Sequence, residues 1–144
     1  MTNIASFMTN DHRACDDAFV EFENMISNQN WSELKSSWDA FSQKTLHHFE
    51  MEETVLFPAF EAATGMSSGP TAVMRTEHQQ MRSLMQEIEQ AIASEDANQC
   101  QGVAETLMLM IQQHNMKEEQ MLYPMSDQHT NGAEVVASMQ SIAQ

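Results

Sequence analysis

Apolar residues recur at alternating steps of three and four along four stretches of the chain, residues 8–26, 34–59, 74–92 and 100–125. This spacing is that of one buried face of an α-helix. Each face is mostly apolar until it reaches a histidine or a glutamate. The second and fourth faces continue past these polar positions through Val55 and Met121, which we therefore predict to be buried. The pattern predicts four long helices and an all-α fold.

Residues that begin and end helices separate the four stretches. Asn30 and Asp96 each stand three residues before a Glu or Gln, which is the capping-box pattern of a helix start. Pro70 suits the first turn of the third helix, and Gly65 suits the end of the second. A last segment, residues 133–142, is predicted as a short fifth helix.

The chain contains an internal repeat with an offset of 66 residues. The segment HFEMEETVLFP, which begins at His48, is matched by HNMKEEQMLYP, which begins at His114, and the same offset relates His12 to His78. The proline that ends each segment is expected to kink or end its helix. Short links between long helices imply antiparallel neighbours. We therefore predict one domain over residues 1–144, an up-down-up-down four-helix bundle made from a duplicated helical hairpin.

Six polar residues lie on the otherwise apolar faces. His48 and Glu52 are four residues apart, as are their repeat partners, so each pair projects from one side of a helix. Burying such groups is costly unless they are satisfied, and two carboxylates in one core repel each other. Two cations would meet both demands. The predicted metal ligands are His12, His48, Glu52, His78, His114 and Glu118.

The two cations would share the two carboxylates. If Glu52 and Glu118 bridge, each ion receives two imidazole nitrogens and two carboxylate oxygens, and one or two octahedral positions stay open. Mixed imidazole and carboxylate ligation with open positions suits iron best among the common metals, with manganese or zinc as alternatives. Solvent or a small exogenous ligand would bind at the open positions.

The order His, HxxxE, His, HxxxE, with EExxLFP and EExxLYP in the two copies, resembles the hemerythrin-like family, also called the HHE cation-binding domain. The resemblance covers roughly residues 10–128. It implies a four-helix bundle of hemerythrin type and a non-haem di-iron centre with an oxo or hydroxo bridge. It also implies that Glu52 and Glu118 bridge the irons and that the four histidines are terminal ligands.

One position departs from the oxygen-carrying hemerythrins, which place two histidines four residues apart on the third helix. Here the residues four before and four after His78 are Met74 and Arg82. His47 points about a quarter-turn away from its neighbour, and His129 lies beyond the second proline, so neither supplies the missing ligand. The set of four histidines and two glutamates is instead similar to relatives linked to iron-centre repair, nitric oxide or peroxide handling, and oxygen or iron sensing.

Other residues near the predicted site have less specific interpretations. Glu119 is a conceivable ligand, although the match with Glu52 favours Glu118. Cys15 is interpreted as a small buried hydrophobe, and Tyr123, whose repeat partner is Phe57, ranks low as a proton or electron donor. Asp16 and Arg82 occupy equivalent places and are predicted to pair across the bundle. Four methionines near the predicted metals are interpreted as core filling: Met8, Met74, Met81 and Met121.

Composition excludes several function classes. The formal charge of −15 repels nucleic acids and anionic membranes. The N-terminus shows no signal-peptide pattern, and the two cysteines have no metal-finger spacing, so a cytoplasmic protein with reduced thiols is expected.

Two functions from different classes follow from the predicted site. The first is binding or reduction of a small molecule, namely O2, NO or peroxide, at an open iron position. The second is a non-enzymatic module that stores, donates or senses iron. A metal-free bundle for partner binding is a third alternative, but it leaves six buried polar groups unexplained. Whether the protein is an enzyme stays open at this point.

Overall fold

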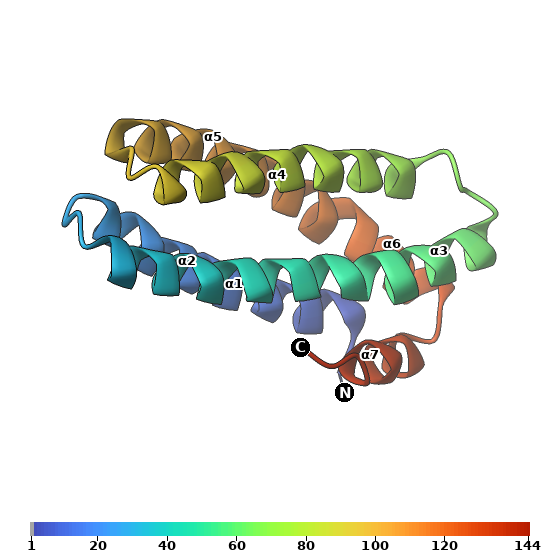
Figure 1. Cartoon of the computed structure of the whole chain (residues 1–144). Helices are drawn as coiled ribbons and strands as arrows, with labels where there is room; N and C mark the ends of the chain where they lie inside the picture. Colours follow the sequence, from blue (N-terminus) through green and yellow to red (C-terminus); the bar gives the residue numbers. More distant parts are fainter. Residues whose placement is uncertain (1) are drawn as a thin grey trace.

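The computed structural model describes residues 2–144 and shows an up-down-up-down bundle of helices, with no strand in that range (Figure 1). Two five-residue π-helical turns, η1 and η2, interrupt the helices at equivalent places. The elements in chain order are α1 (Ile4–Ile26), α2 (Trp31–Met51), η1 (Glu52–Leu56), α3 (Phe57–Thr64), α4 (Pro70–Ala93), α5 (Ala97–Lys117), η2 (Glu118–Leu122), α6 (Tyr123–His129) and α7 (Gly132–Gln140).

Several helix boundaries lie where the sequence predicts. The Asn30 side chain accepts a hydrogen bond from the backbone N–H of Glu33 at 3.2 Å, and Asp96 accepts one from Gln99 at 3.0 Å. Helix α4 begins at Pro70. Gly65 ends α3 with a φ of 73°, a left-handed conformation that glycine adopts without a Cβ penalty. The short C-terminal helix is also present, as α7.

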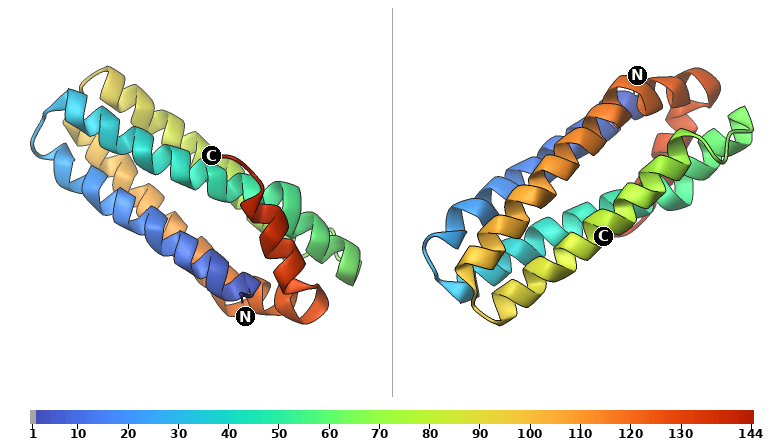
Figure 2. Two further views of the ribbon diagram at one scale, coloured as in Figure 1. Left: turned by 90° about the horizontal axis from the view of Figure 1, so that it is seen from below. Right: turned by 90° about the horizontal axis from the view of Figure 1, so that it is seen from above.

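The two halves of the bundle repeat each other with the offset found in the sequence. Helix α2 and turn η1 correspond residue for residue to α5 and η2. Within each half the two long helices pack as a hairpin, α1 on α2 and α4 on α5. Contacts of α1 with α5 and of α2 with α4 close the bundle (Figure 2). The duplication is therefore expressed in space as two similar hairpins that face each other.

The turns η1 and η2 correct one prediction. The backbone N–H of Phe57 bonds to the carbonyl of Glu52, five residues back instead of four, and Tyr123 bonds to Glu118 in the same way. The helix therefore widens just before each proline and continues through it, instead of kinking or ending there. The extra residue in the turn moves the buried face by one position. Met121 is 44% exposed and Val55 is only partly buried, and the buried residues are instead Leu56, Phe57, Leu122 and Tyr123.

Two hydrophobic cores lie on either side of the predicted metal ligands. The larger core fills the end of the bundle near the α1–α2 and α4–α5 connections and includes Phe19, Phe22 and Trp38. The smaller core lies at the other end, where α7 covers the bundle with Val135, Val136 and Met139. The polar positions of the four long helices are therefore enclosed from both ends.

Hydrogen bonds at the covered end tie the start of α1 to α6. The Asp127 carboxylate accepts hydrogen bonds from the backbone N–H groups of Ile4 and Ala5, at 2.8 and 3.0 Å. A Cβ at Gly132 would lie 2.7 Å from the same carboxylate, so glycine permits this close approach. The start of α1 consequently lies beside the start of α7.

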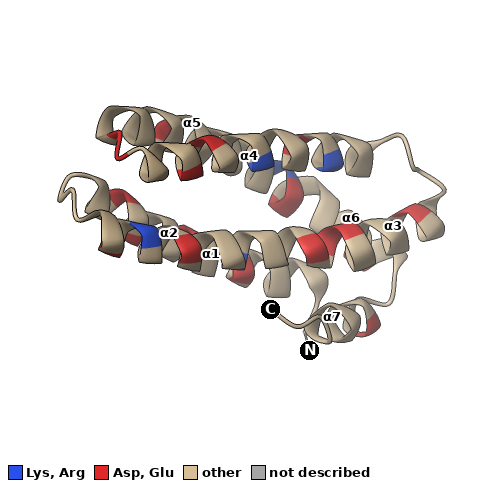
Figure 3. Ribbon diagram, viewed as in Figure 1, with Lys and Arg blue, Asp and Glu red and all other residues tan. Residues whose placement is uncertain are grey.

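Acidic residues far outnumber basic residues on the helices. Acidic side chains occur along the helices, whereas the 6 Lys and Arg residues are scattered (Figure 3). No helix among residues 2–144 is long and apolar enough to cross a membrane.

Candidate metal centre

The six predicted ligands converge in the middle of the bundle. Four lie on the long helices α1, α2, α4 and α5, and the two glutamates are the first residues of η1 and η2. Each is at most 3% exposed. Their ligand atoms form two overlapping groups, each with all atoms within 4.8 Å of one another. We call them the first ligand set (His12, His48, Glu52 and Glu118) and the second ligand set (Glu52, His78, His114 and Glu118).

Each glutamate offers one oxygen to each set. Glu118 Oε1 lies 3.0 Å from His12 Nε2 in the first set, and its Oε2 lies 3.3 Å from His114 Nε2 in the second. Glu52 divides its oxygens in the same manner, with Oε2 at 3.5 Å from His48 Nε2 and Oε1 at 3.0 Å from His78 Nε2. This division of oxygens is what a pair of bridging carboxylates requires.

The second ligand set contains polar atoms that the protein leaves unsatisfied. Among residues 2–144, the buried atoms without a hydrogen-bond partner include Nε2 of His78 and His114, Oε1 of Glu52 and Oε2 of Glu118. These atoms approach one another to 3.0–3.3 Å without hydrogen-bond geometry. Buried polar groups in proteins are nearly always paired, so four converging unpaired atoms indicate a shared cation.

The first ligand set surrounds a tyrosine hydroxyl. Tyr123 Oη lies 2.6 Å from Glu52 Oε2 and 2.9 Å from Glu118 Oε1, and it lies 3.1 and 3.3 Å from Nε2 of His12 and His48. The hydroxyl has one proton to donate, and its shortest contact is with Glu52. Sequence reasoning ranked this residue low because its repeat partner is a phenylalanine. The structure instead places it against all four members of the set.

Every ligand histidine has a carboxylate on its outer nitrogen. The Nδ1 atoms of His48 and His114 contact Asp11 and Glu77 at 2.6 and 2.8 Å. Those of His12 and His78 contact Glu119 and Glu53 at 2.7 and 2.6 Å. Such partners fix the imidazole orientation and leave Nε2 directed at the centre of the cluster, where it could bind a metal ion. Glu119 therefore supports His12 from outside and belongs to neither ligand set. The repeat contained this signal, because acidic residues occupy both members of the pairs Asp11–Glu77 and Glu53–Glu119.

The cluster holds charges of both signs. Burial favours neutral imidazoles, but the Glu118 carboxylate raises the pKa of His114 to about 9. Burial also acts to lower the pKa of His48 and of His78, but the neighbouring carboxylates outweigh it. The pKa of His48 is therefore well above its usual value, and that of His78 is raised. Burial likewise opposes ionisation of Glu118, yet the charge of His114 lowers the pKa of Glu118 well below its usual range. These shifts favour charged imidazoles beside charged carboxylates, a balance that a bound metal ion would replace.

Arg82 does not pair with Asp16, contrary to one prediction. Its guanidinium makes two hydrogen bonds to the Glu53 carboxylate, at 2.8 and 3.0 Å. Against the effect of burial, His78 and Arg82 together lower the pKa of Glu53 to about 2. Lys117 makes an equivalent contact to Glu77. Two of the few basic residues of the chain therefore support outer carboxylates of the second ligand set.

The remaining candidate residues have structural positions. Cys15 and Cys100 form no disulfide, and burial raises the pKa of both thiols. The His47 ring contacts the carbonyl of Ile142 at 3.0 Å, which links α2 to the chain end, and His129 is exposed. Three of the four methionines named above are buried, and Met121 is the exception.

A cavity of about 20 Å³ adjoins the ligands on the side of the larger core. Its wall includes three ligand histidines and mostly apolar side chains from α1, α2, α4 and α5. Asp16 and Asn115, both partly exposed, lie at its edge between α1 and α5. Tyr123 does not line it.

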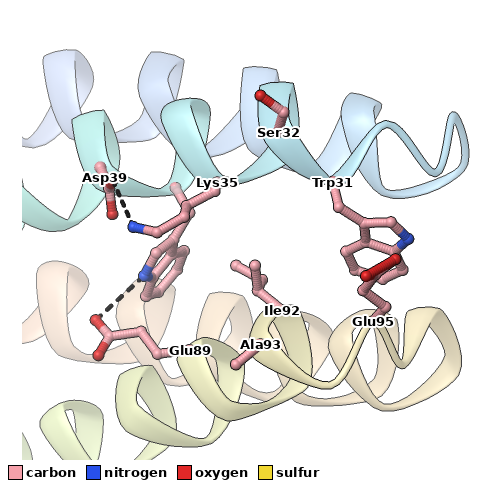
Figure 4. A pocket seen from close by; sticks show the side chains of 9 residues that line it. Trp31, Ser32, Lys35, Asp39, Glu89, Ile92, Ala93 and Glu95 are labelled. Atoms are coloured by element: carbon pink, nitrogen blue, oxygen red, sulfur yellow. Dashed lines mark hydrogen bonds and ion pairs between the residues drawn. The ribbon is translucent and has the colours of Figure 1, made fainter.

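A separate surface groove of about 460 Å³ lies between the start of α2 and the end of α4, at the opposite end from α7 (Figure 4). Its polar groups pair with one another, since the Trp38 indole N–H donates to Glu89 at 3.2 Å and Lys35 donates to Asp39 at 2.9 Å. None of the groove residues belongs to a group of potential metal ligands among residues 2–144.

A four-helix bundle with histidines and glutamates gathered at its centre defines a cation-binding protein. The model of the hemerythrin HHE cation-binding domain family matches residues 3–126. The chain belongs to this family, as the motifs in the sequence predicted. No curated protein and no solved structure matches the chain.

Proposed function

We propose that the chain is a di-iron protein that binds or reduces O2, NO or peroxide at an open iron position. The observation that carries the proposal is the pair of ligand sets that share Glu52 and Glu118, each glutamate with one oxygen toward each set. His12 and His48 would hold one ion, and His78 and His114 the other.

Iron is the metal that this donor set favours. Two imidazole nitrogens and two carboxylate oxygens for each ion leave positions open and are typical ligands of non-haem iron. Bound iron would supply one-electron redox chemistry and vacant positions for a small ligand. Manganese and zinc also accept these ligands, and zinc would remove the redox chemistry.

The residues of the chain would control access, orientation and protons. The outer carboxylates hold each imidazole in place, and the two hydrophobic cores exclude bulk water from both ends of the site. The Tyr123 hydroxyl supplies a proton donor against Glu52. A ligand would approach from the side that is free of Tyr123, through the cavity beside His12, His48 and His114.

A second candidate, a module that stores, donates or senses iron, is favoured by a different observation. In the absence of metal the imidazoles can carry protons that balance the glutamates, as the raised pKa of His114 indicates. Such a site tolerates loading and unloading within one fold, and loading stabilises the folded state.

Metal analysis and turnover separate these functions. We expect about two irons per chain after anaerobic ferrous reconstitution, measured by plasma mass spectrometry. An enzyme should consume many equivalents of NO or peroxide, whereas a storage module should release its iron to a chelator without turnover. A wild-type chain that holds no metal would contradict both functions.

A further inference from the structure

The cavity beside the ligand sets restricts the size of any molecule that binds there. A volume of about 20 Å³ is little more than a single water molecule requires, roughly 10–15 Å³. The apolar part of its wall comes from Phe41, Phe49, Met81 and Ile111. A molecule of two heavy atoms fits such a space, and a larger anion or an organic substrate does not.

One hydroxyl in this wall has no partner. Thr45 lies on α2 one turn before His48 and is 5% exposed. Its hydroxyl makes no hydrogen bond to any of residues 2–144. The nearby Thr45 hydroxyl acts to lower the pKa of the Cys15 thiol. No hydrogen bond of suitable geometry joins the two side chains.

Four other helical threonines pair their hydroxyls within their own helix. A threonine within a helix can donate to the carbonyl four residues earlier. Thr54, Thr64, Thr76 and Thr106 all do so, at 2.7–3.3 Å. Thr45 does not, although the carbonyl of Phe41 stands in the same relation to it.

The packing of the bundle does not require a hydroxyl at this position. The repeat partner of Thr45 is Ile111, which lines the same cavity from α5. An apolar side chain therefore fills the equivalent place in the other half. A buried hydroxyl without a partner destabilises the fold, so its presence next to the ligand histidines calls for a function.

We propose that the Thr45 hydroxyl hydrogen-bonds the small exogenous ligand held in this cavity. The inference rests on the proposed function and assigns one protein contact to its ligand, a molecule of two heavy atoms that accepts a hydrogen bond, such as O2, NO or hydrogen peroxide. Because Ile111 stands at the equivalent position of the second half, this hydrogen bond would come from the first half alone.

Nitric oxide on the ferrous protein is the probe for this contact. Thr45→Val preserves the shape of the side chain and removes the hydroxyl. We expect unchanged iron content, an NO dissociation rate about fivefold faster, as the loss of one hydrogen bond implies, and an N–O stretching band at higher frequency. Thr45→Ser should restore the wild-type band. Thr106→Val, which removes an exposed hydroxyl far along α5, is the matched control and should leave both measurements unchanged.

Thermal unfolding of the metal-free protein distinguishes a ligand-binding role of Thr45 from a structural role. Thr45→Val should unfold at the same temperature as wild type or higher, because it removes an unpaired buried group. If iron-loaded Thr45→Val keeps the wild-type NO rate and band, this inference alone is overturned. If the wild-type chain takes up no iron, or takes up iron and binds no NO, the proposed function is overturned with it.

Discussion

The two ligand sets contain the same metal-binding groups, two imidazoles and two shared carboxylates, but different residues surround them. The first set encloses the Tyr123 hydroxyl. At the equivalent place beside the second set stands Phe57, whose ring lies 5.6 Å from that of His78. Without metal, the first set has an internal hydrogen-bond donor and the second has unpaired atoms. A duplicated framework has therefore produced two unequal positions.

The carboxylates on the outer nitrogens of the histidines also differ between the two sets, in whether a basic residue contacts them. Those of the second set, Glu53 and Glu77, are bound by Arg82 and Lys117. The repeat partners of these two cations are Asp16 and Met51, so the carboxylates of the first set lack the equivalent support. A carboxylate that is not neutralised draws more strongly on the imidazole proton and makes the other nitrogen a stronger donor. We expect the first position to favour the more highly charged metal ion.

Packing adds a third difference. Phe49 stacks on His78 with ring centroids 4.0 Å apart. The Arg82 guanidinium lies over the Phe49 ring, 5.2 Å from its centroid. The repeat partner of Phe49 is Asn115, at the edge of the cavity. The second set is therefore enclosed by aromatic rings, whereas the first lies beside the route to solvent.

Substitution of the predicted metal ligands should have the largest effect and should distinguish the two ligand sets by metal content. Glu118→Ala removes a ligand of both sets, so metal content should fall from about two ions to near zero. His78→Ala touches only the second set and should leave about one ion. Plasma mass spectrometry measures both, with the exposed His129→Ala as control. Equal metal loss in the two variants would contradict the division into two sets.

The pH dependence of stability should be large in the metal-free protein. The folded state keeps the His114 proton up to a pH of about 9, whereas the unfolded chain loses it near 6.5. This stabilisation is complete below pH 6.5 and is lost as the pH rises to 9, by roughly 2–3 kcal/mol. Metal affinity should rise over the same window, because the metal displaces the proton.

Urea unfolding of metal-free protein at pH 6.5 and pH 9 measures this change. His114→Asn should flatten the dependence. A wild-type free energy of unfolding that is the same at both pH values would show that the imidazole carries no proton in the folded state.

Removing the tyrosine hydroxyl should make the two sets more alike. Tyr123→Phe leaves the first set without its donor, and the metal-free protein should lose about 1–3 kcal/mol of stability. The metal-loaded protein should lose less, because a bound ion satisfies the same atoms. Chemical denaturation with and without metal makes the comparison. An equal loss in both forms would reduce Tyr123 to a packing residue.

Removing the guanidinium should give the smallest effect. Arg82→Gln leaves Glu53 as unsupported as Glu119, and the pKa of Glu53 should rise from about 2 toward its usual value. Since this ion pair is partly exposed, the cost in stability should be about 1 kcal/mol or less. NMR titration of the Glu53 carboxyl measures the pKa, and Asp16→Asn is the control at the equivalent position of the first half.

The sequence predicted the parts of the structure that local periodicity and the repeat determine. Helix starts at Asn30 and Asp96, and the convergence of six ligand side chains, follow from spacing alone. Tyr123 was undervalued because its position depends on η2. In an α-helix a residue five after Glu118 faces away from it, and only a wider turn brings both to the same side.

Pairing across helices was the other part that the sequence did not predict. Arg82 and Asp16 occupy equivalent places, which suggested that they meet. The rotation of α4 instead directs the guanidinium to Glu53 on η1. Contacts between elements depend on helix rotation and crossing, which residue spacing within one helix does not determine.

The division of ligands between the hairpins has a consequence for the connection between them. Each hairpin supplies two histidines and one glutamate, so neither can complete a ligand set alone. A protease cut in the linker between Thr64 and Pro70 would yield two fragments that share both ions. With metal present the fragments should remain associated as a two-piece protein, and a chelator should weaken their association to what the shared hydrophobic core supplies. The strength of association between the two fragments would then depend on the concentration of free metal.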